Sequence, residues 1–402
     1  MHIARIGIMG GSFNPVHLRH IQIAECALKE AKLSRVLFIP TGNPPHKHTE
    51  LAPAEDRLEM TRLATEGRAA FAVSDVEIER SGVIYTVDTL KILKQRFPKA
   101  DFFYIIGEDT LLDLPNWRNP DGVFSMCRFL VCRRSSMDAS QHPICKELEE
   151  RGARFQYLSL PPEDVSATAV REALARGEEP PALQPQVLEY IRLMGLYGTT
   201  PYLANGRAVY EKLRKDLNDR RLYHSLLVAY TARLLARKHG LDENAAAIAG
   251  LLHDCAKCMP LSEMQQIAKE HRLLLDKETL HNGSLLHGYV GATLAEVSYG
   301  VTDPNVLSAI ACHTMGKVGM LPLDMVLFLA DKIEPSRHSY PALETVRTLA
   351  DTSLIAAMRC AMQNTLTYVL AQKTIPHPTT KRVADWLGHM ESQENQRSEI
   401  HE

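Results

Sequence analysis

The sequence predicts a two-domain protein in which an α/β domain built on a parallel sheet precedes an all-α domain. The chain has 402 residues, and globular domains usually contain about 100–200. Residues 1–198 alternate short apolar runs with amphipathic stretches, which is typical of a Rossmann-like parallel sheet covered by helices. Beyond about residue 205, helical periodicity alone remains. The two halves therefore follow different structural patterns.

The expected strands of the first domain are Val-, Ile- and Phe-rich runs bounded by Gly, Pro or polar clusters. In parallel sheets, ligands bind at the carboxyl ends of strands, so the loops that follow strands are expected to carry the site. The expected strands are Ile3–Met9, Arg35–Pro40, Ala70–Ile78, Asp101–Gly107, Arg128–Arg133 and Phe155–Leu160, and the expected helices are His17–Ala31, Ala54–Glu66, Thr86–Phe97 and Thr168–Arg176.

Residues 199–205 are expected to be a linker, because GTTPYLAN (198–205) combines Gly, Pro, Asn and Thr. The second domain is expected over 206–390. Residues 391–402 lack an apolar face and are expected to form a disordered tail. The expected helices of the second domain are Arg207–His239, Asp242–Asp254, Leu261–Glu270, His287–Tyr299, Asn305–His313, Leu323–Ile333 and Ala342–Gln372.

The composition excludes several functional classes. The formal net charge is −2, with no basic stripe of the kind that binds nucleic acid. No apolar run reaches the roughly 18 residues that a membrane helix needs. The eight cysteines are scattered without a disulfide-framework spacing, which favours a reducing, cytoplasmic location. The composition leaves open whether the chain forms a homo-oligomer.

The loop after the first expected strand has the residue types of a phosphate site. It contains GGSFNPVHLRH (10–20), where Gly10 and Gly11 allow a tight turn and close approach of the backbone to a ligand. The amide groups at the start of the following helix form an anion site. His17 and His20 lie three residues apart and so share one side of its first turn. Such imidazoles can donate hydrogen bonds to phosphoryl oxygens as charge develops.

This segment resembles the H-x-G-H signature of the nucleotidyltransferase superfamily. Arg19 stands where the family has glycine, and it either contacts phosphate or fills free space. The segments IPTGNPPHK (39–47), SGVIYTVDTL (81–90), IIGEDTLLDLPNWR (105–118) and VSATAVR (165–171) occur in the order seen in bacterial nicotinate-nucleotide adenylyltransferases. The resemblance implies the nucleotidyltransferase fold for residues 1–198. It also implies transfer of AMP from ATP to nicotinate mononucleotide, which gives deamido-NAD and pyrophosphate.

The resemblance also implies roles for individual residues. A second phosphate clamp would lie at the start of another helix, where Ala167 replaces a serine of the family. Mg²⁺ is expected to enter with ATP, since no dedicated carboxylate cage is apparent. The implied catalytic residues are His17, His20 and Arg171, and the implied ATP- or substrate-binding residues are Gly10, Gly11, Ser12, Asn43, Lys47, Thr86, Gly107, Asp109, Trp117, Ser166 and Thr168.

In the second domain, His and Asp side chains fall on the apolar stripes of three expected helices. His224 lies four residues before Val228, the doublet His253-Asp254 ends the expected helix Asp242–Asp254, and Asp331 lies four residues after Leu327. Buried imidazoles and carboxylates need partners, and a metal ion would satisfy all of them together. We therefore expect His224, His253, Asp254 and Asp331 to bind a metal.

The pattern His…His-Asp…Asp resembles the all-helical HD-domain metallohydrolases. His287 and His313 resemble the additional histidines of subfamilies that hold two metals or a phosphate-rich ligand. Together with FLADKIEPSR (328–337), the set resembles symmetrical bis(5′-nucleosyl)-tetraphosphatases. The resemblance implies hydrolysis of diadenosine tetraphosphate (Ap4A) to two ADP by a metal-bound water, with Fe favoured over Mn or Zn. It implies nucleotide binding by Lys257, His287, His313 and Arg337.

Other functions remain open from the sequence. The first domain could instead transfer AMP to pantetheine phosphate. The second could hydrolyse guanosine tetraphosphate or dNTPs, or bind nucleotides as a regulatory module without hydrolysis. Cys255 and Cys258 form a C-x-x-C, but no second cysteine pair accompanies it to indicate a zinc site.

Overall fold

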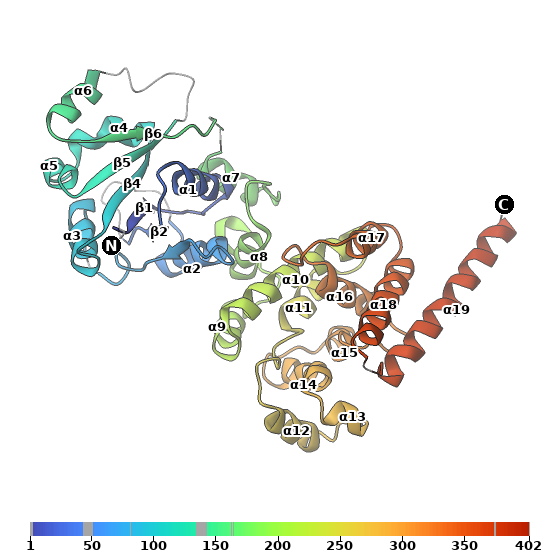
Figure 1. The fold of residues 1–402 in the computed structure, drawn as a ribbon. Coiled ribbons are helices and arrows are strands. Elements are labelled where there is room, and N and C mark those ends of the chain that lie inside the picture. Colours follow the sequence, from blue (N-terminus) through green and yellow to red (C-terminus); the bar gives the residue numbers. More distant parts are fainter. Residues whose placement is uncertain are drawn as a thin grey trace. The chain divides into compact units, whose positions relative to one another are not determined.

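The computed structural model describes residues 3–42, 51–80, 82–133, 143–161, 163, 165–373 and 375–401, with side chains described up to residue 390. The chain divides into two compact units (Figure 1). Unit 1 comprises residues 1–191 and 195–199, and unit 2 comprises residues 192–194 and 200–402. The division falls near the end of α8, Pro185–Met194. Each unit is described by itself below.

Unit 1 contains a parallel sheet with the strand order β3-β2-β1-β4-β5-β6. This is the Rossmann-like order, in which the chain reverses direction across the sheet between β1 and β4, and ligands bind at the carboxyl ends of these strands. The sequence-based prediction of a parallel α/β sheet is therefore confirmed. The strands are β1 Arg5–Gly11, β2 Arg35–Pro40, β3 Phe71–Val73, β4 Asp101–Gly107, β5 Cys127–Cys132 and β6 Phe155–Tyr157.

The core of unit 1 lies against the sheet, where alternate strand residues such as Ile8, Phe102 and Phe129 are buried. Helices of this unit pack on the strands of the sheet. Short helices α4, α5 and α6 were not expected, because segments of five to eight residues give too little periodicity to recognise. The helices are α1 Leu18–Glu30, α2 Ala54–Thr65, α3 Thr86–Arg96, α4 Glu108–Asp113, α5 Pro120–Phe124, α6 Pro143–Glu150, α7 Ala167–Ala175 and α8.

Unit 2 is all-helical across its described residues, as predicted. The predicted helix Arg207–His239 is two helices, because Asn218 caps a new one by accepting a hydrogen bond from the Arg221 amide. Ser353 divides the predicted helix Ala342–Gln372 in the same way. The helices are α9 Gly206–Asp216, α10 Asp219–Lys238, α11 Glu243–Leu252, α12 Leu261–Glu270, α13 Lys277–Leu280, α14 Gly283–Val297, α15 Pro304–Cys312, α16 Pro322–Ile333, α17 Pro341–Ala350, α18 Leu354–Ala371 and α19 Pro378–His401.

Residues 391–402 were expected to form a disordered tail, but in the structure α19 continues to His401. The segment 391–401 contains three Glu, two Gln and one Arg, which are strong helix formers, so a helix can continue there without an apolar face. Among the described helices, none combines the length and apolar character that crossing a membrane requires.

Candidate functional sites

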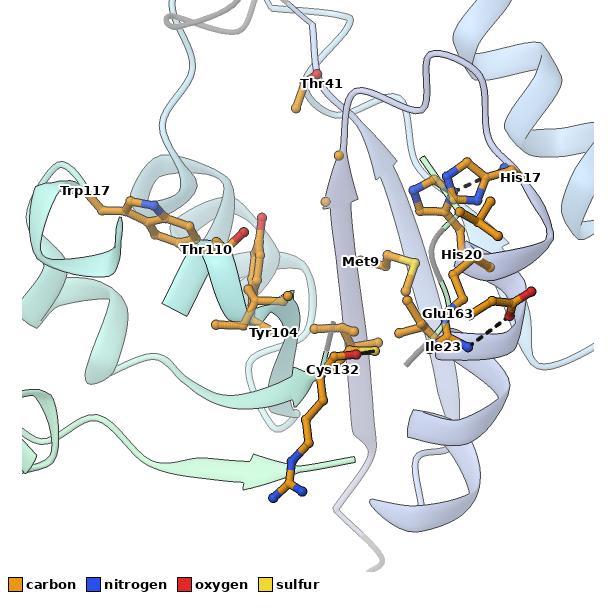
Figure 2. A pocket seen from close by; sticks show the side chains of 18 residues that line it. Met9, His17, His20, Ile23, Thr41, Tyr104, Thr110, Trp117, Cys132 and Glu163 are labelled. Atoms are coloured by element: carbon orange, nitrogen blue, oxygen red, sulfur yellow. Dashed lines mark hydrogen bonds and ion pairs between the residues drawn. The ribbon is translucent and has the colours of Figure 1, made fainter. Parts of the chain in front are cut away.

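A cavity of about 290 Å³ opens in unit 1 at the carboxyl ends of β1 and β4. It brings together predicted site residues from two separate segments, and Figure 2 shows His17 and His20 on one side with Tyr104 and Trp117 on the other. Its position is the one that the strand order predicts for a ligand. Of the residues predicted from the sequence, Gly10, Gly11, His17, His20, Gly107 and Trp117 line it.

His17 and His20 form one stacked unit at the start of α1. Their ring centroids are 3.8 Å apart, and the backbone N–H of His17 donates to Nδ1 of His20 over 3.2 Å. Because Nδ1 accepts this hydrogen bond, the proton of a neutral His20 ring lies on Nε2. The histidine pair thus faces the cavity at the start of α1, where the Leu18 amide donates to the Ala182 carbonyl at 2.8 Å.

Gly10 and Gly11 serve a different purpose from the tight turn that the sequence predicts. Both belong to β1, and the left-handed residue that turns the chain is Phe13, with φ of 44°. A Cβ atom on Gly10 would lie 2.3 Å from the hydroxyl oxygen of Tyr104. The absence of a side chain at Gly10 therefore allows the Tyr104 hydroxyl to approach the strand at the cavity wall.

Arg57, which the sequence analysis did not single out, holds the loop that carries the histidines. Its side chain is 1% exposed and donates to three backbone carbonyls: Ser12 O at 2.8 Å, Ala52 O at 3.0 Å and Gly42 O at 3.1 Å. A buried guanidinium with three carbonyl partners fixes the relative positions of the segments that it joins. Only its place in an amphipathic helix was visible in the sequence.

Arg171 joins α7 to the same loop. Its Nη1 donates to Asn14 O at 2.8 Å and its Nη2 to Thr168 Oγ1 at 3.2 Å. Ser166 caps α7 by accepting from the Ala169 amide at 3.1 Å. The predicted second clamp, Ser166, Thr168 and Arg171, is thus brought to the loop that precedes His17.

Arg19, at the position of the family's glycine, points toward the segment around residue 161. It donates to Glu163 Oε2 and Gln22 Oε1, each at 3.3 Å, and to the carbonyl of Pro161. Since Arg19 and Glu163 both line the cavity, their ion pair forms part of its wall.

Tyr104 and Trp117 form the opposite side of the cavity, with ring centroids 5.9 Å apart in an edge-to-face arrangement. Burial raises the pKa of the Tyr104 hydroxyl, which also hydrogen-bonds Thr86. Thr86 therefore contacts the cavity wall rather than the cavity itself. Asp109 is exposed and is not among the lining residues, whereas its neighbour Thr110 is. Asn43 and Lys47 lie outside the described residues.

In unit 2, six His and Asp side chains from separate segments meet in one cluster. The predicted ligands His224, His253, Asp254 and Asp331 are joined there by His287 and His313. Asp254 belongs to two sets of potential metal ligands, one with His224 and His253 and one with His287 and His313, and within each set the ligand atoms lie within 4.8 Å of one another. Its Oδ2 lies 3.6 Å from His253 Nε2, and its Oδ1 lies 3.1 Å from His287 Nε2.

The orientation of the histidine rings indicates what the cluster binds. Nδ1 of His253 lies 2.7 Å from Gly250 O, and Nδ1 of His313 lies 2.7 Å from Ile310 O. A carbonyl only accepts, so each Nδ1 carries the proton and each Nε2 presents a lone pair. Nε2 of His253 is buried, has no hydrogen-bond partner among the residues that the structure describes, and lies 3.8 Å from Asp331 Oδ1.

Lone pairs and carboxylates that face one another repel unless a cation lies between them. Two ligands about 2.1 Å from one ion are separated by roughly 3–4 Å, which matches the 3.1–3.8 Å between the Nε2 and carboxylate atoms here. Backbone carbonyls that fix the outer ring nitrogen are the usual second shell of metal-binding histidines. The cluster therefore has the composition of a divalent metal site.

The electrostatics of His253 and His287 agree with this assignment. Burial lowers the pKa of His253 to about 3 and also lowers that of His287, so both rings stay neutral, as metal ligands must. Burial alone would raise the pKa of Asp254, but its histidine neighbours outweigh it and lower that pKa. Burial lowers the pKa of His224, but the hydrogen bonds to Asp331 and Glu334 outweigh burial and raise that pKa.

Basic side chains surround the cluster. Nη2 of Arg337 lies 2.8 Å from Asp331 Oδ1, and Nζ of Lys257 lies 3.2 Å from His287 Nε2. The sequence analysis assigned His287 and His313 to nucleotide binding, but both are buried and belong to the potential ligand set. Only the proximity of both histidines to Asp254 in the tertiary structure distinguishes metal ligation from nucleotide binding.

The sequence analysis missed two further members of the site. Arg221 donates through Nη1 to Asp254 Oδ2 at 2.8 Å, and it lies one helical turn before His224. Glu334 is fully buried and lies 3.2 Å from His224 Nδ1, three residues after Asp331. The sequence signal that could have identified Glu334 was its helical spacing from Asp331, within FLADKIEPSR.

Comparison with known proteins covers both units. The family model for cytidylyltransferase-like proteins matches residues 8–173, and that for the HD domain matches residues 221–336. A Mycoplasma pneumoniae protein named probable nicotinate-nucleotide adenylyltransferase/Ap4A hydrolase is 31% identical over 367 residues, which is 90% of this chain and 98% of that protein. A Gloeobacter violaceus protein named probable nicotinate-nucleotide adenylyltransferase is 41% identical over 48% of this chain and 96% of its own length.

Among solved structures, one from Clostridium acetobutylicum is described as a predicted HD superfamily hydrolase involved in NAD metabolism. It is 33% identical and covers 47% of this chain and 99% of its own, with a TM-score of 0.45.

Proposed function

Because the chain belongs to the family of two-domain nicotinate-nucleotide adenylyltransferase/Ap4A hydrolases, we propose that it carries both activities. Unit 1 transfers AMP from ATP to nicotinate mononucleotide, and unit 2 hydrolyses Ap4A to two ADP. The observation that supports this most directly is the presence of two separate candidate sites in one chain. One is the cavity with His17 and His20, and the other is the cluster around Asp254.

The cavity of unit 1 suits in-line adenylyl transfer. The substrate phosphate attacks the α-phosphorus of ATP and pyrophosphate leaves, so the protein mainly positions the reactants and stabilises charge. His17 and His20 would donate to the ATP phosphates from the start of α1. Arg171 would approach the same phosphates, because it is tied to the loop at Asn14. Mg²⁺ would enter bound to ATP.

The aromatic side of the cavity suits the two rings that the reaction brings together. Trp117 offers a flat face for the nicotinate ring, and Gly107 leaves room for the adenosine at the end of β4. Thr86 would act through Tyr104, with which it shares a hydrogen bond, rather than by touching the pyridine carboxylate directly. Ser12, Asn43, Lys47 and Asp109 complete the proposed binding set from the loops after β1, β2 and β4.

In unit 2, His224, His253, Asp254 and Asp331 would hold the metal, with His287 and His313 completing a second set around Asp254. A bound divalent metal activates water and withdraws charge from the phosphoryl group. The mixed imidazole and carboxylate donors suit iron, and also manganese or zinc. Arg221, Lys257 and Arg337 would neutralise the polyphosphate, since each is a cation beside the ligand set.

The boundary between the activities is proposed at 199–205, with unit 2 functional over 206–390. We also infer a cytoplasmic location, because all eight cysteines are free, as expected in a reducing compartment.

A product assay on the full chain tests both activities. With ATP, deamido-NAD should form from nicotinate mononucleotide faster than any product forms from the amide or from pantetheine phosphate. With Ap4A and a divalent metal, ADP should be the sole nucleotide product. A mixture of AMP and ATP would instead mean asymmetric cleavage, and binding without turnover would indicate a regulatory module.

A further inference from the structure

A cavity of about 490 Å³ in unit 2 is lined mainly by residues of α17 and α18, and nothing described above uses it. Both helices are labelled in Figure 1. We call this cavity the α17/α18 cavity. Its volume falls within the range of roughly 300–1,000 Å³ that is typical of small-molecule sites. It combines an apolar floor, two tyrosines and several polar side chains, which is the usual make-up of such a site.

We propose that the α17/α18 cavity binds one nucleoside of the dinucleoside polyphosphate that the metal centre cleaves. This inference rests on the proposed hydrolase function. A substrate with a nucleoside at each end needs more than a phosphate site, because its nucleoside must be held at a fixed distance from the reacting phosphate.

The first support is the pair of tyrosines. Tyr340 is 52% exposed and Tyr368 is 67% exposed, although both are large aromatic side chains. The same cavity is also lined by the buried apolar side chains of Leu343, Val346 and Ala361. Exposed aromatic rings in one cavity with buried apolar side chains offer a suitable stacking surface for a purine.

The second support is a hydrogen-bond acceptor on the face that α18 turns to the cavity. Asn364 donates through Nδ2 to the Ala342 carbonyl at 3.4 Å. Its Oδ1 has no hydrogen-bond partner within the described residues, so it can accept from the exocyclic amine of adenine. Thr365 donates to the Ala361 carbonyl at 2.9 Å and keeps its own acceptor capacity. The cavity therefore offers polar contacts beside the stacking surface.

The third support is Lys332, which borders both the α17/α18 cavity and the metal centre. This residue lines the α17/α18 cavity, and its Nζ lies 3.9 Å from Oδ2 of the proposed ligand Asp331. The same Nζ lies 4.9 Å from the centroid of the Phe328 ring, which limits its position. A nucleoside in the cavity would thus place its phosphates beside a lysine that already borders the cluster. Lys332 would neutralise them on the way to the cleaved bond.

The test uses the full metal-loaded chain and steady-state hydrolysis of Ap4A. Tyr368→Ala should raise KM about tenfold with little change in kcat, because stacking is lost while the metal centre is untouched. Tyr368→Phe should keep KM within twofold, and Tyr340→Ala should repeat the effect from a different segment. Leu370→Ala is the matched control, since Leu370 is an exposed apolar neighbour on α18 that does not line the cavity.

Two readouts separate nucleoside binding from other causes. Inhibition by inorganic tetraphosphate should be equal in the parent and in Tyr368→Ala, because this probe has no nucleoside. Titration calorimetry of ADP with the chelator-treated chain should lose one component of binding in Tyr368→Ala and not in Leu370→Ala. Thermal melting identifies any variant that has lost its fold, and Tyr340→Ala then replaces Tyr368→Ala.

Unchanged KM and unchanged ADP binding in both tyrosine variants would overturn the inference while leaving the hydrolase function intact. If Tyr368→Ala and Leu370→Ala both turn a dimer into a monomer with KM unaltered, the surface is an interface with a second copy, and the inference is again overturned. If the parent hydrolyses no Ap4A but its ADP binding depends on Tyr368, the proposed function fails and the nucleoside site stands.

Discussion

Oδ1 of Asp254 lies 3.1 Å from Nε2 of His287, although the two residues are 33 positions apart in the sequence. The other carboxylate oxygen of Asp254 faces His253 at 3.6 Å and accepts from Arg221 at 2.8 Å. One carboxylate therefore connects both groups of potential metal ligands. This arrangement makes Asp254 the most informative residue to replace.

Replacing Asp254 by Ala should abolish Ap4A hydrolysis and reduce bound metal, because both potential ligand sets lose a member. Adenylyl transfer should stay within a few-fold of the parent, since its cavity is built from other segments. Elemental analysis and both activity assays check this. Asp351→Ala, which removes an exposed carboxylate from the same unit, is the control. Full metal and full hydrolysis in Asp254→Ala would refute the ligand assignment.

Glu334 should affect metal affinity without being a ligand itself. It is fully buried and 3.2 Å from Nδ1 of His224, so it orients that ring and increases its basicity. Glu334→Gln keeps an acceptor but removes the charge, and should weaken metal binding about 10- to 100-fold. Titration of the apo chain with metal measures this affinity. Excess metal should restore hydrolysis, and a failure to restore it would argue for a direct role in the reaction.

His17→Ala should lower kcat for adenylyl transfer about 10²- to 10³-fold, as expected for loss of a donor to a charged phosphoryl group. Ap4A hydrolysis should be unchanged. Because His17 is buried, thermal melting must accompany the kinetics, and a variant that keeps its fold isolates the loss of the phosphate donor. His281→Ala, an exposed histidine of unit 2, is the control. A variant that unfolds would indicate a structural histidine instead.

Arg57 should be needed for the shape of the nucleotide loop. Replacement by Lys leaves a charge but cannot reach the carbonyls of Ser12, Gly42 and Ala52 together. We expect the free energy of unfolding to fall by about 2–3 kcal/mol, from lost charged hydrogen bonds and unpaired carbonyls. We also expect a higher KM for ATP. Chemical denaturation and kinetics check this, with exposed Arg62→Lys on the same helix as control. If Arg57→Lys keeps the parent's free energy of unfolding and KM for ATP, Arg57 does not support the loop.

The fragment 1–199 should retain adenylyl transfer, whereas a fragment ending at residue 194 should lose much of it. Tyr197 donates to Oδ1 of Asn14 at 2.8 Å, and Asn14 also holds Arg171 through its carbonyl. The shorter fragment lacks this support of the loop. Activity and solubility of both fragments measure the difference, and Tyr197→Phe in the full chain tests the hydrogen bond alone. Equal activity in both fragments would show that Tyr197 is dispensable.

The sequence by itself determined the two fold classes, the expected ligands of the metal cluster and six of the eighteen residues that line the cavity of unit 1. These follow from periodicity and from short motifs, such as GGSFNPVHLRH and the His253-Asp254 doublet, which are local in the chain. Helix ends such as Asn218 were missed because a cap divides one apolar stripe without interrupting its periodicity.

Only the tertiary structure decided which distant residues meet. Arg57 belongs to a helix whose sequence gives no sign that its guanidinium binds Ser12, 45 residues earlier. His287 and His313 were expected to bind nucleotide, and the structure places both beside Asp254 in a set of potential metal ligands. The Tyr340 and Tyr368 surface became visible only when α17 and α18 packed together. Hydrogen bonds and burial depend on the approach of separate segments, and a local pattern carries no information about that approach.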